Sequence, residues 1–349
     1  NSTVATPLAE EGEYSLVGHK WFFSAPMSDG FLVLAQAPGG LTCLLMPRRL
    51  DDGGRNAFQL VRLKDKLGDW ANASSEVEFC GARARRVGEE GRGIATILEM
   101  VMLTRLDCML GASAEMRMAL AQALHHARHR RAFGKRLVDH ALMRNVLADL
   151  ALESEAALSF SMRVARAIDA APHDPAEAAF ARVATAIGKY WLCKRTPAFV
   201  NEAQECLGGA GYVEESILPR LYRQAPLNSI WEGSGNIQCL DLLRALSREP
   251  ETIAVLVAEL ERGGHRDGNL AAVVSILRTE LPAMSRDEFG ARMLVERLAL
   301  ALQASVMVQS GSQLADLFVR SRLQGSHGLA FGTLPAGMDI DLAIARALP

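Results

Sequence analysis

Short apolar runs separated by turn-forming residues occupy the first quarter of the chain. Between residues 8 and 88 these runs alternate apolar and polar positions or are rich in β-branched and aromatic residues, and clusters of Gly, Asp, Asn and Pro separate them. The runs are EYSLVGHKWFFSA, GFLVLAQA, LTCLLMP, FQLVRLKDKL and SSEVEFC. Their length and spacing predict one all-β domain, a small barrel or sandwich, over residues 1–92.

The hydrophobic period changes after a glycine-rich loop, Gly88 to Gly93. From Ile94 apolar residues recur at helical spacing on two opposite faces, which is the pattern of a helix that is buried nearly all round. The sequence predicts four helices, at about 94–131, 142–171, 175–207 and 237–247. Together they predict an antiparallel four-helix bundle over residues 93–247.

Further amphipathic segments follow Pro250. They cover about 251–262, 269–281 and 286–324, and a tail with Gly and Pro follows them. We therefore expect a helical C-terminal extension over residues 248–349. Because the β-rich part precedes an all-helical part, the chain is predicted to be an α+β multidomain protein and not an alternating βαβ sheet.

Composition excludes a disordered chain and gives no global attraction to polyanions. The 349 residues are 49% hydrophobic and 22% charged, as in ordinary globular proteins. The formal net charge is only -2, so nucleic acid or an anionic membrane surface would have to be bound by a local basic patch.

The spacing of the cysteines and the length of the apolar runs indicate the cellular compartment. Six cysteines are scattered without a CxxC pair, which is typical of reduced core thiols and not of a disulfide framework or a zinc site. No apolar run reaches the roughly 18 residues of a membrane span, and no signal segment is visible. A cytoplasmic protein is therefore expected. Because Asn1 lies in loop-like sequence, we interpret the chain as the later part of a longer protein.

Two segments next to helix ends have two interpretations each. The stretch LGGAGY, from Leu207, follows a helix and lacks the GxGxxG spacing, so it is typical of a helix C-cap, although it would also let a backbone approach a flat cofactor closely. The stretch HHARHRRAFGKR, from His125, carries five permanent cations and is either a solvated helix end or a clamp for phosphate groups. The same cations would repel a divalent metal from His125 and His129, so no metal site is expected.

A single carboxylate stands at the start of the fourth bundle helix, in the stretch NSIWEGSGNIQCL. Glu232 lies between Trp231 and Gly233, just before a helix whose first backbone N–H groups are unpaired. An acid beside an indole and glycine can be desolvated and act as a general base near neutral pH. A solvent-facing acid at a helix start is the alternative.

The order of the motifs settles this choice. Seven of them follow one another along the chain: YSLVGHKWFFS, KDKLG, GEEGRG, RRAFGKRL, LGGAGY, RLYR and IWEGSGNIQ. In sequence and spacing they resemble the acyl-CoA dehydrogenase family of flavoproteins, from about residue 12 to 246. HKWFFS, RLKDKLG, TRLDCMLG, CKR and EESILPRLYR are most similar to its AidB branch, which is linked to DNA alkylation damage.

The resemblance implies a fold and an assembly. Members of the family have an N-terminal helical domain, a middle β domain and a C-terminal four-helix bundle, and form homo-oligomers, usually tetramers of paired dimers. The N-terminal helical domain of that fold is missing from this sequence.

The resemblance also implies roles for individual residues. Glu232 matches the catalytic base, and Arg105 matches an arginine near the acyl-CoA site. The positions matching FAD contacts are Phe22, Phe23 and Ser24 against the isoalloxazine, Arg130 and Phe133 toward the FAD of a neighbouring subunit, Gly208 and Gly209 beside the adenosine, and Ile230, Trp231, Gly233, Ser234, Gly235 and Asn236 around the flavin and its phosphates.

The implied function is that of an FAD-dependent acyl-CoA dehydrogenase, in which a base removes the α-proton of an acyl-CoA thioester and the β-hydride passes to the flavin N5. A flavoprotein that binds double-stranded DNA in the response to alkylation damage is the alternative. From Ser247 onward ten arginines face twelve acidic residues, so DNA binding there would require the arginines to gather on one face. A helical scaffold that has lost its flavin is the third hypothesis.

Overall fold

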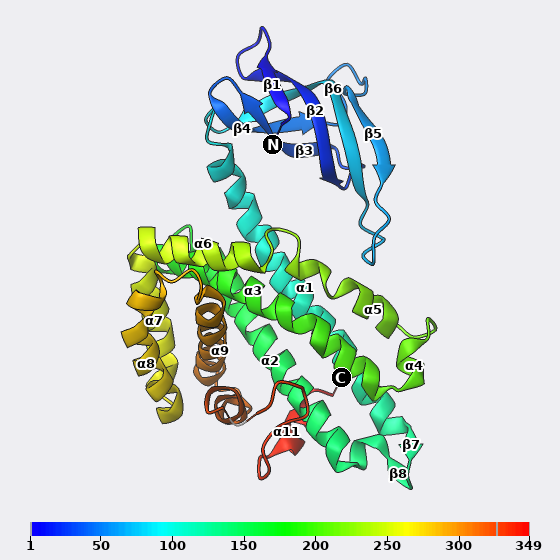
Figure 1. Cartoon of the computed structure of the whole chain (residues 1–349), viewed down its shortest axis with the longest axis vertical. Coiled ribbons are helices and arrows are strands. Elements are labelled where there is room, and N and C mark those ends of the chain that lie inside the picture. Colours follow the sequence, from blue (N-terminus) through cyan, green and yellow to red (C-terminus); the bar gives the residue numbers. More distant parts are fainter. Residues whose placement is uncertain (1, 326, 349) are drawn as a thin grey trace. The chain divides into compact units, whose positions relative to one another are not determined.

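The computed structural model describes residues 2–325 and 327–348 (Figure 1). Contacts divide the chain into two compact units, Asn1–Leu103 and Thr104–Pro349. The first unit is rich in β-strands and the second is helical, as the change of hydrophobic period predicts.

Six strands of the first unit form one sheet in the order β2-β1-β3-β4-β6-β5, and β2 also pairs with β6. This extra pairing closes five of the strands into a ring, so the predicted small barrel is confirmed. All pairings are antiparallel except β1 with β3. The strands are β1 (Val4–Pro7), β2 (Glu13–Ser24), β3 (Gly30–Ala37), β4 (Gly40–Pro47), β5 (Phe58–Leu63) and β6 (Ser74–Val87).

An irregularity near the end of β2 decides which aromatic rings face outward. Lys20 pairs with Val77 and Phe23 with Ser75, so two residues of β2 oppose one residue of β6. The bulge leaves Trp21 and Phe22 exposed on consecutive positions, while the ring of Phe23 packs in the barrel core against Phe31, with centroids 4.5 Å apart.

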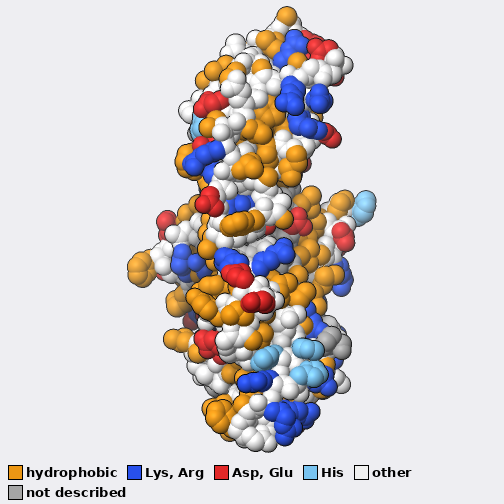
Figure 2. All heavy atoms as spheres, turned by 90° about the vertical axis from the view of Figure 1, so that its right-hand side faces the viewer, with side chains coloured by type: hydrophobic (Ala, Val, Ile, Leu, Met, Phe, Trp, Pro, Cys, Tyr) orange, Lys and Arg blue, Asp and Glu red, His pale blue; other side chains and the backbone are white. Residues whose placement is uncertain are grey.

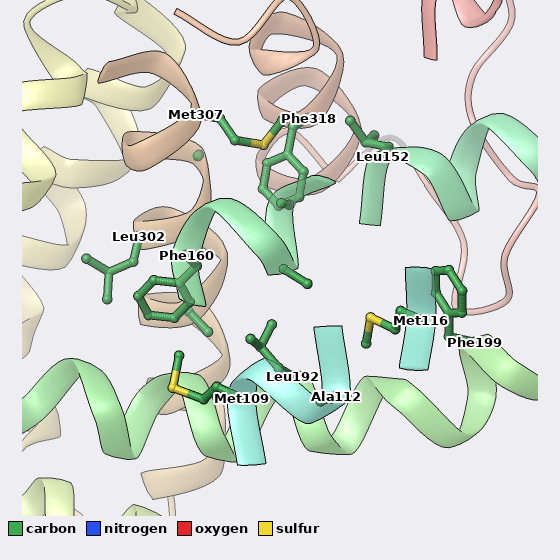
Figure 3. Packing of buried hydrophobic residues seen from close by; sticks show 14 of the residues in the cluster. Met109, Ala112, Met116, Leu152, Phe160, Leu192, Phe199, Leu302, Met307 and Phe318 are labelled. Carbon is green, nitrogen blue, oxygen red and sulfur yellow. The ribbon is translucent and has the colours of Figure 1, made fainter. Parts of the chain in front are cut away.

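The second unit is built on long helices around one hydrophobic core. The first of them, α1, begins in the first unit and contributes Met109, Ala112 and Met116 to this core (Figure 3). The helices and short strands from there on are α1 (Gly93–His129), β7 (Arg131–Ala132), β8 (Lys135–Arg136), α2 (Ala141–Ala170), α3 (Pro175–Cys206), α4 (Gly209–Tyr212), α5 (Leu218–Gln224), α6 (Gly235–Arg248), α7 (Glu251–Gly264), α8 (Gly268–Met284), α9 (Ala291–Gln309), α10 (Ala315–Phe318) and α11 (Ile340–Arg346).

The C-terminal segment shares the core of the bundle helices. Phe160 of α2 and Leu192 of α3 lie in the same buried cluster as Leu302 of α9 and Phe318 of α10 (Figure 3). The division into a bundle over 93–247 and an extension over 248–349 stays a prediction. No helix in the described parts of the second unit, or of the first, is long and apolar enough to cross a membrane.

Two details differ from the expectations. The amphipathic segment predicted over 286–324 is helical but not continuous, because α9 ends at Gln309, Gly311 takes a φ of +69°, and the chain resumes as α10 and a π-helical turn, Val319–Leu323. Apolar spacing continues through this break, which is why periodicity alone misses it. Five cysteines are buried thiols as expected, but Cys80 is exposed.

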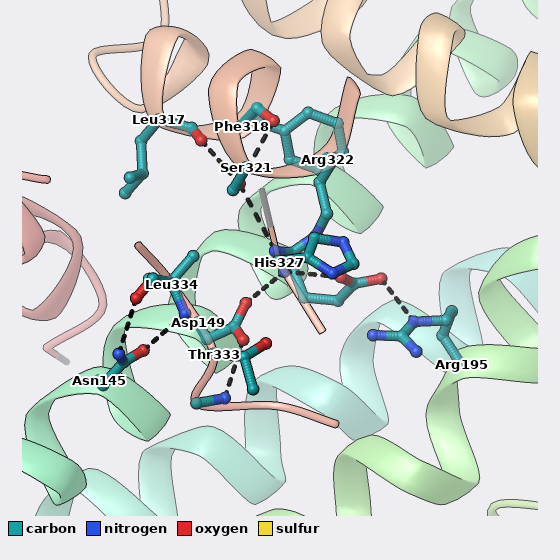
Figure 4. A network of polar contacts seen from close by, with 12 residues as sticks. Asn145, Asp149, Arg195, Leu317, Phe318, Ser321, Arg322, His327, Thr333 and Leu334 are labelled. Carbon is teal, nitrogen blue, oxygen red and sulfur yellow. Dashed lines mark hydrogen bonds and ion pairs between the residues drawn. The ribbon is translucent and has the colours of Figure 1, made fainter. Parts of the chain in front are cut away.

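A buried ionic network ties the π-helical turn to α2 and α3 (Figure 4). Arg322 pairs with Asp149 and, at 3.2 Å, with Glu153, which also accepts a hydrogen bond from Arg195 at 3.1 Å. Burial alone would raise the pKa of Glu153, but the charges of Arg195 and Arg322 hold that pKa below its usual range. Asp149 also accepts from the backbone N–H of Gly332 at 2.8 Å, so the network orders the C-terminal tail.

Replacing Arg322 by Met should therefore destabilise the protein strongly. Removing one partner of a buried ion pair leaves the other charge uncompensated and costs about 3 to 5 kcal/mol; we expect about 3 kcal/mol, because Glu153 keeps Arg195. Urea denaturation followed by far-UV circular dichroism measures this loss of unfolding free energy. The matched control is Arg320→Met, which removes an exposed pair with Asp316 and should change stability by less than about 1 kcal/mol. Equal effects of the two substitutions would contradict a structural role for the network.

Candidate active site

The stretch that carries Glu232 connects a 3-10 turn, Leu227–Ser229, to α6. Glu232 has a φ of +55° and Gly233 a φ of +94°, so two consecutive residues adopt the left-handed conformation. A Cβ at Gly233 would come within 2.9 Å of Gln238 Nε2 and 3.0 Å of Ile237 Cγ2. Glycine is therefore required at this position for both its backbone conformation and its lack of a side chain.

Three side chains from the interior hold three consecutive carbonyl groups of this turn; we call them the carbonyl clamp: Arg105, Lys189 and Gln238. The Lys189 ammonium donates to the carbonyl oxygens of Trp231 and Gly233, both at 2.5 Å. The Glu232 carbonyl accepts from Arg105 Nε at 3.2 Å and from Gln238 Nε2 at 3.1 Å. Gln238 Nε2 also lies 2.8 Å from the Gly233 oxygen.

The clamp is buried and charged. Lys189 is 1% exposed and Gln238 0%, so their donors face little competition from water. Burial lowers the pKa of Lys189. Arg105 is balanced by Asp241, at 2.6 Å, which also binds Arg182. Burial alone would raise the pKa of Asp241, but Arg182 and then Arg105 outweigh this and lower it.

The carboxylate of Glu232 is left free while its backbone is fixed. The side chain is half-buried, and within residues 2–325 and 327–348 no hydrogen bond or ion pair reaches its carboxylate. Its charge nevertheless acts on two neighbours. Burial, with the Glu232 charge as a smaller cause, raises the pKa of the Cys108 thiol to about 11, and the same charge partly offsets the effect of burial on Lys189.

The residues around Glu232 offer both apolar surface and unpaired backbone donors. Trp231 is 36% exposed, and its indole N–H donates to Asn228 Oδ1 at 3.0 Å, which fixes the ring. Ile230 is exposed. Ser234 is the N-cap of α6 but makes no capping bond, so the first N–H groups of a 14-residue helix are open to an acceptor.

Two more of the expected residues lie close to the start of α6. Gly235 is buried, and a Cβ there would come within 3.3 Å of the Tyr190 ring. The side-chain oxygen of Asn236 accepts a hydrogen bond from Arg292 Nε at 2.9 Å. Arg105, expected near an acyl-CoA site, donates from its guanidinium to the Glu232 carbonyl and to Asp241; its role toward acyl-CoA stays a prediction.

The glycine pair lies where α3 ends. Gly208 has a φ of +59° and directly follows Leu207, the C-cap of α3, so a glycine supplies a positive φ at the end of this helix, as the helix-end interpretation predicts. A Cβ at Gly208 or Gly209 would meet nothing within 4 Å. The backbone here is therefore open to close approach, which keeps the alternative, a cofactor contact, available.

The basic segment forms an exposed hairpin at the end of α1. Phe133 is 94% exposed with a φ of +51°, between the strands β7 and β8, which periodicity did not predict. Figure 2 shows Lys, Arg and His side chains gathered at the bottom of the view, over this hairpin and the end of α1. Arg136 pairs with Asp139 at 2.9 Å, whereas Arg130 has no side-chain partner in the described chain.

In the first unit the three expected flavin contacts are not equivalent. Phe22 and Ser24 are exposed, but Phe23 lies in the barrel core and can offer a ligand only its backbone. Trp21 and Phe22 line a shallow depression of about 810 Å³. The Lys64 ammonium lies 3.1 Å from the centroid of the Trp21 ring, which fixes the wall of this depression.

Within the second unit the structure therefore brings together Arg105 and the turn from Ile230 to Asn236. Arg130 lies about 37 Å farther along α1 than Arg105, at 1.5 Å per residue, so one active centre within this unit does not contain both. Lys189 and Gln238 were not foreseen. Their one signal is chemical: each is a polar residue at a core position of its helix, Lys189 within AIGKYWLC.

Comparisons with known proteins identify what the chain is similar to. Residues 91–247 match the acyl-CoA dehydrogenase C-terminal domain. The putative acyl-CoA dehydrogenase AidB of Escherichia coli K12 is 55% identical over 249 residues, which are 71% of this chain and 46% of that protein. The chain thus spans about half the length of this relative.

Solved structures show the same fold. Caenorhabditis elegans ACDH-11 in complex with C11-CoA has a TM-score of 0.84 at 26% identity, over 99% of this chain and 61% of that one. An acyl-CoA dehydrogenase from Bacillus anthracis complexed with FAD has a TM-score of 0.76 at 16% identity, over 91% of this chain and 62% of that one. Residues 91–247 thus belong to the acyl-CoA dehydrogenase C-terminal domain family, and the chain is similar to acyl-CoA dehydrogenases over most of its length.

Proposed function

We propose that the chain is the catalytic part of an FAD-dependent acyl-CoA dehydrogenase and that Glu232 removes the α-proton of an acyl-CoA thioester. The observation that carries this proposal is a carboxylate without an ion partner in the described chain, on a backbone held by the carbonyl clamp. A general base must be positioned before it reacts, and a carboxylate in a tight ion pair is a weaker base. Glu232 meets both requirements.

The acyl-CoA substrate is proposed from chemistry and from a relative. The C. elegans structure contains C11-CoA. The exposed Ile230 and half-exposed Trp231, which precede Glu232, offer apolar surface for an acyl chain.

FAD is proposed as the cofactor, and the residues present fit it. The open backbone at Gly208 and Gly209 is suited to an adenosine, and the exposed ring of Phe22 is suited to a flat ring. The cation of Arg130, which has no side-chain partner among the described residues, is suited to a pyrophosphate. When bound, FAD would supply an acceptor for the β-hydride. Because Arg130 lies about 37 Å along α1 from Arg105, we propose that it serves the FAD of a neighbouring subunit in a homo-oligomer, a tetramer or dimer of dimers.

Glu232→Gln should remove acyl-CoA oxidation and leave folding intact. The substitution keeps the shape of the side chain but removes the proton acceptor, so kcat should fall by at least about a hundredfold. The rate of acyl-CoA oxidation is measured in the intact protein by the anaerobic bleaching of flavin absorbance after addition of short, branched and long acyl-CoA. Glu288→Gln, an exposed acid, is the control and should retain the parental rate. An active Glu232→Gln variant would contradict the assignment of the base.

Lys189→Met should displace the base without removing it. It leaves the Trp231 and Gly233 carbonyls without their charged donor, and a hydrogen bond to a charged group is worth about 1.5 to 3 kcal/mol. We expect a loss of about 2 kcal/mol in the unfolding free energy, since the penalty of burying the ammonium disappears as well. We also expect kcat to fall about tenfold or more with a smaller change in KM. The control is Lys194→Met, which removes an exposed lysine of the same helix and should change neither the unfolding free energy nor kcat.

Arg130→Ala should weaken FAD retention. A charged bidentate contact to pyrophosphate is worth about 1.5 to 3 kcal/mol, so the dissociation constant should rise by about ten- to a hundredfold. Dialysis followed by the flavin spectrum measures occupancy. The control is Arg128→Ala, which removes an exposed arginine two residues earlier, on the last turn of α1. Unchanged FAD occupancy in Arg130→Ala would contradict the proposed contact.

A DNA-associated flavoprotein is the second candidate, and the exposed basic hairpin at the end of α1 is what favours it (Figure 2). The C-terminal arginines do not add to such a face, because six of them pair with carboxylates: Arg262, Arg278, Arg297, Arg320, Arg322 and Arg346. A gel shift with duplex DNA that weakens steeply with salt would support it, and no shift at low salt would remove it.

A further inference from the structure

A cavity of about 550 Å³ lies in the second unit where α2, α3, α7 and α9 meet. Ligand sites in proteins commonly have volumes of about 300 to 1,000 Å³. Its charged lining consists of four arginines and two glutamates: Arg163, Arg166, Arg262, Arg266, Glu177 and Glu259. The cavity therefore has an excess of two positive charges. Glu177 precedes Lys189 of the clamp by about 18 Å along α3.

Both carboxylates are committed to partners inside the protein. Glu259 is fully buried and accepts two hydrogen bonds from Arg163, at 3.0 and 2.9 Å, together with bonds from Arg262 and Gln309. Glu177 accepts two more from Arg163, at 2.7 and 3.0 Å. The Arg163 guanidinium also stacks on the Phe180 ring, with 4.2 Å to the centroid. Arg163 and the two acids thus form a structural group, which Arg262 and Gln309 join through Glu259.

The other three arginines keep unused donors. Arg166 is exposed and makes no side-chain hydrogen bond or ion pair within the described chain. Arg266 donates one bond, to the backbone oxygen of Gln309 at 2.9 Å. Arg262 shares Glu259 with Arg163, and its side chain is 52% exposed. Each guanidinium has five N–H donors, so most of the donors of these three residues have no acceptor among the residues that the structure describes.

The electrostatics of the cavity favour an anion. Burial, and after it the positive charge of Arg163, lowers the pKa of Arg262, and Arg166 contributes in the same direction. Like charges gathered in a partly buried cavity repel one another, and a bound anion would relieve this repulsion. Met162 and Val306 give the cavity an apolar side as well.

We propose that this cavity binds a small phosphate monoester through Arg166, Arg262 and Arg266. A phosphate group carries about -1.5 to -2 charges at pH 7, which matches the excess of two positive charges, whereas a single carboxylate would neutralise half of it. Guanidinium forks recognise phosphate oxygens in pairs. Met162 and Val306 would contact the organic part of the ligand. This site is separate from the Glu232 turn and does not depend on flavin or acyl-CoA.

Isothermal titration calorimetry on the intact protein tests the proposal, with inorganic phosphate and glycerol phosphate as probes and sodium chloride at matched ionic strength as the blank. We expect saturable binding of both probes. Arg166→Gln and Arg266→Gln should each weaken it about tenfold, and the double variant should abolish it. Both residues are exposed, so both variants should fold. Arg278→Gln, an exposed arginine outside the cavity lining, is the control and should bind as the parent does.

Three outcomes would overturn the proposal: no heat beyond the chloride blank, equal binding by the parent and the double variant, or binding of duplex DNA through these arginines without binding of either monoester. Because calorimetry requires no turnover, a failure here is distinguishable from a failure of the proposed dehydrogenase activity.

Discussion

The turn at Glu232 depends on one constraint: three consecutive carbonyl groups face the protein interior, where water cannot solvate them. An unsatisfied buried carbonyl is costly, so each needs a donor from the protein. The donors come from three different helices, Arg105 from α1, Lys189 from α3 and Gln238 from α6. The packing of these helices around their shared core therefore determines where the carboxylate lies. The apolar core and the polar site are parts of a single arrangement.

Much of this architecture follows from hydrophobic period. Period-two alternation located the barrel, and helical spacing located the long helices, because burial of one face or of nearly all faces is recorded directly in the sequence. The start of α3 follows as well, since Asp174 caps it and Pro175 occupies its first position. Glu232 and the glycines beside it were identified by their order among other motifs.

The rest depends on three-dimensional detail that no pattern carries. The bulge in β2 turns Phe22 outward and Phe23 inward, although adjacent phenylalanines look alike in the sequence. The ammonium of Lys189 finds its acceptors on a turn that is 42 residues away. The guanidinium of Arg105 holds a backbone oxygen 127 residues away, which the sequence does not reveal. Side-chain direction and long-range partners decided each of these cases.

Arginines in the second unit serve two different purposes. Arg163 and Arg322 are surrounded by carboxylates and bind helices to one another, so their charges are fully used within the fold. Arg130 and Arg166 have no such partners in the described chain. Burial and pairing, more than residue type, separate arginines that build the structure from arginines available to a ligand.

The left-handed backbone of Glu232 has a consequence for the stability of this site. A residue other than glycine pays about 1 to 2 kcal/mol for that conformation, so glycine at position 232 would relieve the strain. The turn therefore carries its carboxylate at a cost in stability that a glycine there would not have, whereas the next residue, Gly233, has a positive φ without that cost.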